Sequence, residues 1–492
     1  MSELPGAVGL LGGGVIGGGW AARFVLSGVD VALFDPALEA QRRVREMLDN
    51  ARRAYRSLTM VPLPREGELR FVDSVEEAVA GTEFVQESAP ERLEIKRELL
   101  RAASQAAQPD VVICSSTSGI RPTLMQELME DPGRLVVGHP FNPVYLVPLV
   151  EVCGGEQTDP AAVKRAIAIY EALGMHPLHV RREIDGFVAD RLLEALWREG
   201  LWLVHDDVAT VAELDDAIRY GAGLRWAFMG TFLTYRIAGG EAGMRHFLSQ
   251  FGPALQAPWT KLMDVPELTP ELVEKLAAQS DEQVGQAETA ELERWRDDCL
   301  VSVLQGLRAV DAGAGQTLAR WEQGLLDAAG RDGPRASDVP LRLVVQEIPP
   351  AWVDYNDHVH ESRYLQLFAD ATDALLRLIG VDAAYVAATG SFYTVETHLS
   401  HLGQAFAGDR VSVETQVLGF DGKRLHVFHR LLREGEAEPL ATAEQMLLHV
   451  DAGAGRVAPA DGSVGERAAE IARGHEGLPR PDRAGRSIVA TS

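Results

Sequence analysis

The sequence predicts three successive parts: an α/β domain with a largely parallel sheet, an all-helical domain, and an α+β domain in which an antiparallel sheet surrounds one helix. Three observations predict this order. A buried strand, a glycine-rich turn and a helix open the chain, hydrophobic residues recur at helical spacing from residue 184, and strand-like alternation returns after a polar stretch at 330–338. We expect these parts at 1–183, 184–329 and 340–452, with a linker at 330–339 and a mostly disordered tail at 453–492.

Composition and charge narrow the class of protein. The chain has 492 residues, enough for several domains, and a net charge of −25 that repels nucleic acid and anionic membrane surfaces. Cys114, Cys153 and Cys299 are too few and too scattered for a disulfide framework or a metal cage. The first residues lack the pattern of a signal sequence, and no apolar run is long enough to span a bilayer. We therefore expect a cytoplasmic enzyme with small-molecule substrates, no nucleic-acid or membrane partner and no metal.

The opening segment carries a dinucleotide-binding fingerprint. A predicted strand at 7–11 runs into the glycine-rich turn, a helix follows, and a second strand at 31–34 ends at Asp35. The glycines permit a tight turn and a close approach of the backbone to a pyrophosphate, which the helix N-terminus attracts. Asp35 would bind ribose hydroxyls and repel a 2′-phosphate, which predicts NAD rather than NADP. The alternative is a purely structural turn. The predicted cofactor-binding residues of the turn are Gly12, Gly13, Gly14, Val15, Ile16 and Gly17.

The rest of the first part continues as helices and strands. A run of Ser and Thr at 115–118 follows a buried strand, at the sheet edge where ligands of doubly wound folds bind. The same run could instead be a turn or a helix cap. The expected elements are a helix from 36 to about 58, strands at 75–79 and 84–86, a helix opening within 87–100, and a strand at 111–113.

A histidine and a glutamate stand in two neighbouring apolar runs. His139 stands where the run at 135–137 ends, and Glu151 lies within the run at 149–152, with three prolines between them. Because buried polar groups are costly unless they are paired, we expect the two side chains to face each other. They would then form a proton-transfer dyad. The alternative is a structural histidine with an unrelated glutamate.

These motifs, in this order, resemble the 3-hydroxyacyl-CoA dehydrogenases. The resemblance rests on the glycine motif, on Glu91 with Lys96, and on the phrases SSTSG, GHPFNP and LVEV, and it covers about residues 5–325. The phrases GHPFNPVYLVPLVEV, GFVADRLLEALWRE and RYGAGLRWAFMGTF are similar to the carnitine 3-dehydrogenase branch of that family. The resemblance implies a Rossmann domain, an all-α domain that forms homodimers, and carnitine as the substrate.

The resemblance also implies a role for each matching residue. His139 would be the general base that takes the 3-hydroxyl proton, and Glu151 would orient and stabilise its imidazole. Ser118 would hydrogen-bond the substrate oxygen, and Asn142 would position the substrate or the nicotinamide. The positions that match the cofactor side are Glu91, Lys96 and Ser116.

Three features depart from the acyl-CoA members of that family. Ser116 and Asp190 each replace a usual Asn, and the helical insertion after Asp35 that holds CoA is short. Asp190 and the short insertion oppose a large anionic CoA substrate. We expect Asp190 to be the counter-charge for a trimethylammonium group beneath an aromatic cage, although aromatic residues at helical spacing could equally be core. The cage residues would be Trp226, Phe228 and Tyr235.

The hydrophobic period changes after the linker. One amphipathic helix is predicted at 362–379, after a polar loop at 353–358, and Asp421 with Gly422 forms a hairpin turn. This arrangement predicts an antiparallel sheet wrapped around a helix. The expected strands are 341–345, 392–399, 411–418, 425–433 and 440–450.

This order, with the phrase WVDYNDHVHESRY, resembles the 4-hydroxybenzoyl-CoA-type hot-dog thioesterases over about 340–452. The resemblance implies that Asp354 is the catalytic acid, as nucleophile or general base against a thioester carbonyl that amides of the following helix polarise. Asp354 could instead be a helix cap or a solvated loop acid. Asp357 stands where that family usually has Gly. His358 and His360 are too closely spaced and lack further partners, so we expect no metal there.

Together the two resemblances imply a bifunctional enzyme, which oxidises carnitine to 3-dehydrocarnitine with NAD and hydrolyses betainyl-CoA. They also imply a homodimer through the helical domain, with a possible higher-order assembly through the hot-dog domain. Two alternatives stay open. One is a 3-hydroxyacyl-CoA dehydrogenase fused to a general acyl-CoA thioesterase. The other makes the hot-dog part a non-catalytic dimerisation or ligand-binding module, because Asp357 disturbs the loop of Asp354.

Overall fold

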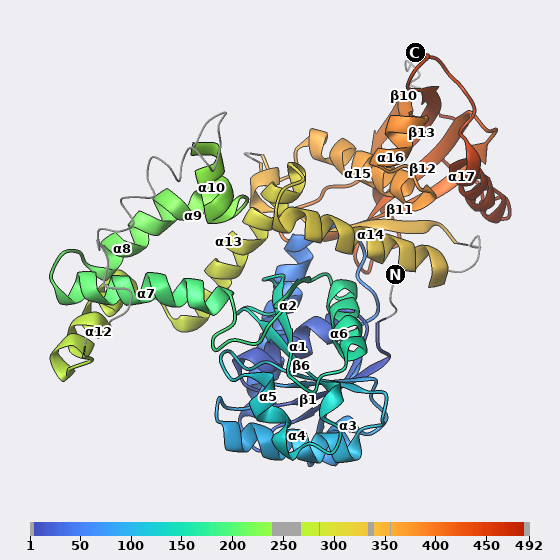
Figure 1. Ribbon diagram of the computed structural model, residues 1–492. Helices are drawn as coiled ribbons and strands as arrows, with labels where there is room; N and C mark the ends of the chain where they lie inside the picture. The colour runs from blue at the N-terminus through green and yellow to red at the C-terminus, as the bar shows by residue number, and fades with distance from the viewer. Residues whose placement is uncertain (1–3, 239–266, 285, 333–338, 355, 487–492) are drawn as a thin grey trace. The chain divides into compact units, whose positions relative to one another are not determined.

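A computed structural model describes residues 4–238, 267–284, 286–332, 339–354 and 356–486 (Figure 1). Its contacts divide the chain into two compact units, residues 1–54 with 65–320 and residues 55–64 with 321–492. The short segment 55–64 belongs to the second unit because of its own contacts there. The Tyr55 ring lies 5.5 Å from the Trp321 ring, and the Val345 amide donates to the carbonyl of Met60 (2.9 Å).

An eight-stranded sheet forms the centre of the first unit, in the order β3-β2-β1-β4-β5-β6-β7-β8. Neighbouring strands are parallel except β6 and β7, which are antiparallel. Every residue of β4, β5 and β6 is buried, as expected for strands covered on both faces. The predicted α/β class is thus confirmed. The strands are β1 (Ala7–Leu11), β2 (Asp30–Phe34), β3 (Leu69–Val72), β4 (Phe84–Glu87), β5 (Val112–Ser115), β6 (Leu135–Pro140), β7 (Leu149–Gly154) and β8 (His176–His179).

One prediction for the elements around this sheet is wrong. Residues 75–79 form a helix rather than a strand, because Ser74 caps the first turn by accepting from the amide of Glu77 (3.2 Å). The helix expected to open within 87–100 begins at Leu93, after the end of β4 at Glu87. The helices are α1 (Val15–Leu26), α2 (Ala40–Leu58), α3 (Val75–Val79), α4 (Leu93–Ala106), α5 (Pro122–Met125) and α6 (Pro160–Ala172).

The predicted all-helical region is confirmed over its described residues; residues 239–266 lie outside them. Its first helix begins later than residue 184, where the helical spacing of the sequence starts. Gly186 and Phe187 have φ angles of +71° and +43°, which are left-handed, so the first helix starts at Ala189. The last helix runs to Asp332, so 330–332 are helical rather than linker, and 333–338 lie outside the described residues. The helices are α7 (Ala189–His205), α8 (Val211–Ala217), α9 (Gly223–Trp226), α10 (Gly230–Ala238), α12 (Pro270–Val284), α13 (Thr289–Ala309) and α14 (Ala314–Asp332).

The second unit contains the predicted antiparallel sheet with one long helix, α15 (Glu361–Ile379), against it. The strand order is β10-β13-β12-β11-β9. Buried residues of α15 such as Leu367 and Phe368 pack against Val413, Leu431 and Ala443 of the sheet. The predicted hot-dog class is therefore confirmed. The strands are β9 (Leu341–Glu347), β10 (Gly390–His401), β11 (Arg410–Phe420), β12 (Arg424–Arg433) and β13 (Pro439–Asp451), with a short helix α16 (Ala383–Ala388) before β10.

Part of the tail predicted to be disordered is a helix, α17 (Gly462–His475). Val464 and Ala468 are buried in the same cluster as Leu375 of α15. The imidazole of His475 is also buried, and its Nδ1 accepts a hydrogen bond from the amide of Val417 in β11 (2.9 Å). The expectation of a disordered tail fails because a few apolar residues are enough to hold this helix when the sheet and α15 supply the rest of the core. Residues 487–492 lie outside the described part of the chain.

A buried polar network stands in this core beneath α15. His429 is inaccessible to solvent and lies between two hydroxyls, with Nδ1 2.9 Å from Thr415 Oγ1 and Nε2 3.1 Å from Thr372 Oγ1. Thr372 in turn donates to Gln445 Oε1 (2.6 Å). A neutral imidazole satisfies this network by accepting at one nitrogen and donating at the other. Burial lowers the pKa of His429 to about 4.

We predict that His429 makes the second unit sensitive to acid. Since its folded-state pKa is depressed, its contribution is complete above the unfolded pKa of about 6.5 and is lost as the pH falls towards 4. At pH 5 this loss should be about 2 kcal/mol. Calorimetry of the full chain at pH 7.5 and pH 5 should show a smaller difference in Tm for His429→Gln than for wild type. The control is His176→Gln at an exposed position, and an unchanged difference in His429→Gln would contradict the assignment.

Candidate active sites

The predicted dyad forms in the first unit. Strands β6 and β7 pair with His139 directly opposite Glu151, and His139 Nδ1 lies 3.0 Å from Glu151 Oε2. His139 is 5% exposed and Glu151 is fully buried. Because Glu151 can only accept when ionised, the Nδ1 nitrogen carries the proton and leaves Nε2 as a free acceptor. The geometry is therefore that of a general base held by a carboxylate.

The second oxygen of Glu151 is held by backbone amides. Its Oε1 accepts from the amides of Val188 and Ala189 (2.9 Å each), where helix α7 begins. Burial alone would raise the pKa of Glu151, but the hydrogen bonds from His139 and these two amides keep it below its usual value. The carboxylate is therefore ionised at neutral pH and cannot rotate without losing three partners.

Asp190 faces the free side of the imidazole. Asp190 lies in the first turn of α7, and its Oδ2 is 3.8 Å from His139 Nε2. Burial is the main cause that raises the pKa of Asp190, and the charge of Glu151 adds to it, while His139 opposes them. The rings of Phe141 and Phe187 lie 4.8 Å and 6.0 Å from the imidazole ring, which makes its surroundings apolar.

The glycine turn fits a dinucleotide. Gly12 has a φ of +107°, and a Cβ at Gly17 would lie 1.9 Å from the carbonyl oxygen of Gly12, so both positions require glycine. A Cβ at Gly14 would meet no atom within 4 Å, which leaves room for a phosphate at the N-terminus of α1. Asp35 holds the turn, since its Oδ2 accepts from the amide of Gly13 (2.6 Å). Val15 is exposed and Ile16 half-buried beside this cradle.

Glu91 organises the turn that contains Ser118. Its Oε1 accepts from the amides of Ser118 and Gly119 (3.1 Å each) and from the Thr117 hydroxyl. Its Oε2 lies 3.4 Å from Lys96 Nζ, and Lys96 is 1% exposed. Burial would raise the pKa of Glu91, but the bond from Thr117 and the charge of Lys96 lower it below its usual value. Glu91 and Lys96 thus fix this turn, and Ser118 is exposed on it.

Ser116, predicted on the cofactor side, has a buried hydroxyl with three protein partners. Its Oγ accepts from Trp20 Nε1 (3.0 Å) and Gln86 Nε2 (2.7 Å) and lies 2.9 Å from the hydroxyl of Ser88. These contacts use the full capacity of a hydroxyl group. Ser116 therefore joins strands of the sheet and helix α1.

The other predicted substrate residues lie at the surface of this unit. Asn142 is exposed directly after β6 and precedes a cis peptide bond to Pro143. Trp226 on α9 is half-buried, and Phe228 and Tyr235, beside and on α10, are exposed. The described residues of one chain therefore do not enclose these three aromatic side chains, and the aromatic cage stays a prediction.

In the second unit, Asp354 lies in a tight turn before α15. Its Oδ1 accepts from the amides of Asn356 (2.8 Å) and, more weakly, His358 (3.4 Å). The helix cap weighed as an alternative for Asp354 is not formed, because the N-cap of α15 is His360. Asp354 closes the preceding turn instead, through its Oδ1 oxygen. Asp357 has a φ of +61°, which explains why glycine suits this position and how an Asp is tolerated there. Helix α15 starts four residues later at Glu361.

Several residues that hold these sites carry no sequence motif. Buried Asp297 of α13 accepts a hydrogen bond from the hydroxyl of Tyr145 (2.7 Å), which anchors the loop after His139 to the helical region. Phe187 is buried beside His139. An acid at a position that the helical pattern buries is the signal that could have identified Asp297. No sequence signal indicates the left-handed conformation of Phe187.

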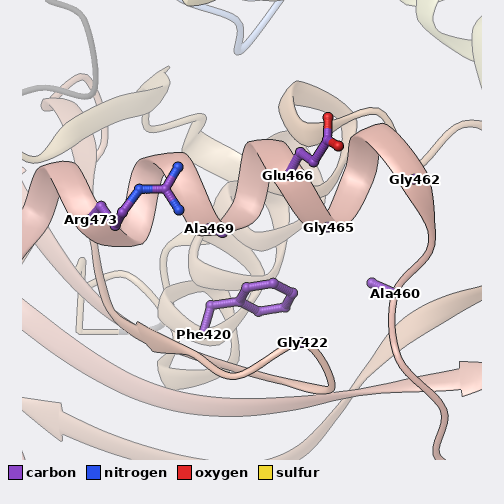
Figure 2. A pocket seen from close by; sticks show the side chains of 8 residues that line it. All are labelled: Phe420, Gly422, Ala460, Gly462, Gly465, Glu466, Ala469 and Arg473. Carbon is purple, nitrogen blue, oxygen red and sulfur yellow. The ribbon is translucent and has the colours of Figure 1, made fainter.

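One pocket of about 390 Å³ lies between α17 and the turn that joins β11 to β12. Figure 2 shows Phe420 beneath the helix that carries Glu466 and Arg473. None of the predicted site residues lines it. Within the described residues, no cluster of three or more His, Cys, Asp or Glu side chains could hold a metal ion, and no helix is both long and apolar enough to cross a membrane.

Family models match both units. The 3-hydroxyacyl-CoA dehydrogenase NAD-binding domain matches residues 7–184, and the C-terminal domain of the same family matches residues 186–276. The thioesterase-like superfamily matches residues 348–468. The first domain is therefore an NAD-binding domain.

Individual relatives extend the likeness to nearly the whole chain. A protein of Pseudomonas aeruginosa named L-carnitine dehydrogenase is 57% identical over 61% of this chain and 94% of its own. A solved structure of an NAD⁺-dependent 5-formyl-3-hydroxy-2-methylpyridine 4-carboxylic acid 5-dehydrogenase has a TM-score of 0.54 at 29% identity, over 62% of this chain and 99% of that one. A protein of Rhizobium meliloti (strain 1021) named L-carnitine dehydrogenase/betainyl-CoA thioesterase is 52% identical over 97% of both chains. With that identity over that length, the chain belongs to the family of L-carnitine dehydrogenase/betainyl-CoA thioesterases.

Proposed function

We propose that this chain oxidises L-carnitine to 3-dehydrocarnitine with NAD and hydrolyses betainyl-CoA to glycine betaine and CoA. The observation that carries the first activity is the buried His139–Glu151 pair with Asp190 beside the free imidazole nitrogen. The names of the relatives supply the two substrates. Purified protein given NAD with either L-carnitine or 3-hydroxybutyryl-CoA tests the proposal, since NADH formed from the acyl-CoA alone would favour the 3-hydroxyacyl-CoA alternative.

The oxidation needs a base and a stabilised positive charge. The glycine turn with Asp35 would hold NAD, which when bound accepts a hydride from the hydroxyl-bearing carbon. His139 Nε2 takes the hydroxyl proton, and the ionised Glu151 stabilises the imidazolium that forms. Ser118, exposed on the turn that Glu91 holds, would bind the substrate oxygen, and Asn142, exposed three residues after His139, would position the reactants.

The carboxylate of Asp190 would recognise the trimethylammonium group. A quaternary ammonium has no N–H to donate, so charge and aromatic faces must bind it. Asp190 is partly exposed and stands next to the reacting nitrogen, where a small cationic alcohol could reach both. Trp226, Phe228 and Tyr235 would supply aromatic faces where a second subunit encloses them.

The helical region would form the homodimer. Its helices expose large apolar residues, among them Leu192 and Trp197 of α7 and Phe232 of α10. Exposed apolar surface of this extent is typical of an interface. Strand β10, an edge strand with five consecutive exposed residues, would extend the assembly through the hot-dog unit. Sedimentation equilibrium that finds only monomer at micromolar concentration would contradict both interfaces.

The hydrolysis would use the oxygen of Asp354 that does not bind the amides of Asn356 and His358. The Oδ1 oxygen is bound to the turn, so Oδ2 is the one that attacks the thioester carbonyl or removes a proton from the attacking water. In either case the carbon–sulfur bond breaks, and the CoA thiolate leaves and takes up a proton. Direct attack by Oδ2 would leave a mixed anhydride on Asp354, which water then hydrolyses to release the acid, whereas attack by water releases the acid in one displacement. Amides at the start of α15 would polarise the carbonyl.

We predict that His139→Ala lowers the rate of carnitine oxidation roughly 10²- to 10⁴-fold with little change in NAD affinity, because the glycine turn and Asp35 hold the cofactor. Glu151→Gln should be similarly defective. The amides of Val188 and Ala189 require an acceptor, so the Gln side chain must turn its NH₂ towards His139 Nδ1 and force the proton onto Nε2. Initial rates of NADH formation and a fluorescence titration of NADH binding measure both effects. Turnover like that of wild type in either variant would contradict the dyad.

We predict that Asp190→Asn raises the KM for carnitine more than the KM for NAD, because the carboxylate faces the substrate side of His139. The loss of a nearby opposite charge should raise the KM for carnitine roughly tenfold. Glu194→Gln, one turn further along α7 and exposed, is the matched control. Equal changes in the two KM values would identify Asp190 as a structural acid.

We predict that Asp354→Asn removes thioesterase activity while carnitine oxidation persists. Asn keeps the oxygen that binds the amides of Asn356 and His358, so the turn survives while the reacting carboxylate is lost. A thiol-release assay with betainyl-CoA, run beside the NADH assay on the same sample, measures both activities. Wild-type hydrolysis in the variant would show that Asp354 is misassigned, and no hydrolysis by wild type would leave the hot-dog unit as a non-catalytic module.

A further inference from the structure

Asp357 keeps a strained backbone conformation in the turn that carries Asp354. Its φ of +61° lies in the left-handed region, which glycine adopts freely and most other residues avoid. Its amide donates to the carbonyl of Asp354 (3.1 Å), and its side chain is exposed. Glycine would make the same backbone contact without strain. A strained carboxylate kept at a candidate active site points to a use for the carboxylate.

An exposed aromatic ring lies against the same turn. The Phe406 ring centroid is 5.4 Å from that of His358, whose amide donates to Asp354 Oδ1 (3.4 Å). The amide of Val359 donates to the carbonyl of Ala405 (3.0 Å), which ties the two segments together. Phe406 is nevertheless 41% exposed. The turn of Asp354 is thus bordered by an apolar surface that a ligand can cover.

The charges around Phe406 leave this surface suited to a cation. The Arg433 guanidinium lies 6.0 Å from the ring centroid, so the ring already takes part in a cation–π contact. Arg433 is neutralised by Asp409 (3.0 Å) and Glu436 (2.8 Å). Arg433, the arginine at this ring, is therefore already paired, and its charge does not cancel that of Asp357.

We propose that Asp357 and Phe406 recognise the trimethylammonium end of the acyl group that the second unit hydrolyses, an inference that rests on the proposed thioesterase activity of Asp354. In betainyl-CoA one methylene group separates the cation from the thioester carbonyl. An acyl group whose carbonyl lies at Asp354 therefore has its cation within reach of Asp357, three residues away, and of the ring that packs on His358. A carboxylate and an aromatic face are the two groups that bind a cation without N–H.

The test compares betainyl-CoA with 3,3-dimethylbutanoyl-CoA, its neutral isostere, in which carbon replaces the quaternary nitrogen. For wild type we expect a higher kcat/KM with betainyl-CoA. Asp357→Asn and Phe406→Leu should each lower kcat/KM for betainyl-CoA about tenfold, the factor that 1.4 kcal/mol represents, and leave the neutral isostere within about twofold of wild type. Asp482→Asn, an exposed acid in the C-terminal segment, is the matched control and should change neither value.

The outcomes separate this inference from the activity on which it rests. Hydrolysis of both substrates with an unchanged ratio in the two variants would overturn the recognition role and leave the thioesterase intact. An equal loss for both substrates would identify a structural role and also overturn it. No hydrolysis of either substrate by wild type would overturn the thioesterase and this inference with it. Asp357→Gly, which relieves the strained φ, should fold at least as well as wild type and show the same loss of selectivity.

Discussion

The first unit depends on the carboxylate of Glu151. One oxygen binds His139 and the other binds the amides of Val188 and Ala189, so one buried side chain joins β6, β7 and the first turn of α7. A helix N-terminus carries partial positive charge, which helps to keep this carboxylate ionised although it is buried. The helical region therefore begins at the dyad itself. The position of Asp190, one residue beyond these amides, follows from the same contact.

The sequence was sufficient to predict the dyad but not what holds it. His139 and Glu151 stand in apolar runs separated by prolines, and two such runs have few arrangements other than neighbouring strands. The amides of Val188 and Ala189 could not be predicted, because every residue except proline carries such a donor and only the fold decides which remain unpaired. Phe187 adopts a left-handed φ that its residue type does not predict, so the helical spacing from residue 184 indicates an earlier start than Ala189, where α7 begins.

The errors in the fold occur where local contacts outweigh the hydrophobic pattern. Residues 75–79 have apolar ends that suit a short strand, yet the cap from Ser74 makes them a helix. Helix α17 has few large side chains, and only its packing on α15 and the sheet makes it stable. For Asp357 the resemblance predicts a disturbed loop, yet the turn forms with both amide contacts of Asp354, and Asp357 carries the strain of a positive φ.

Three carboxylates of the candidate sites share one arrangement. Glu151, Glu91 and Asp354 each bind two nearby backbone amides with one oxygen. The two amides fix one oxygen of the side chain and leave the second oxygen for a different contact. In Glu151 that oxygen binds His139, and in Glu91 it lies beside Lys96. In Glu151 and Glu91 the hydrogen bonds from amides help to keep the pKa of the carboxyl below its usual value, so one can orient a base and the other can fix a turn. What differs among the three is the group that the fold brings to the second oxygen, and this difference, rather than residue type, separates a positioning acid from one that can take part in catalysis.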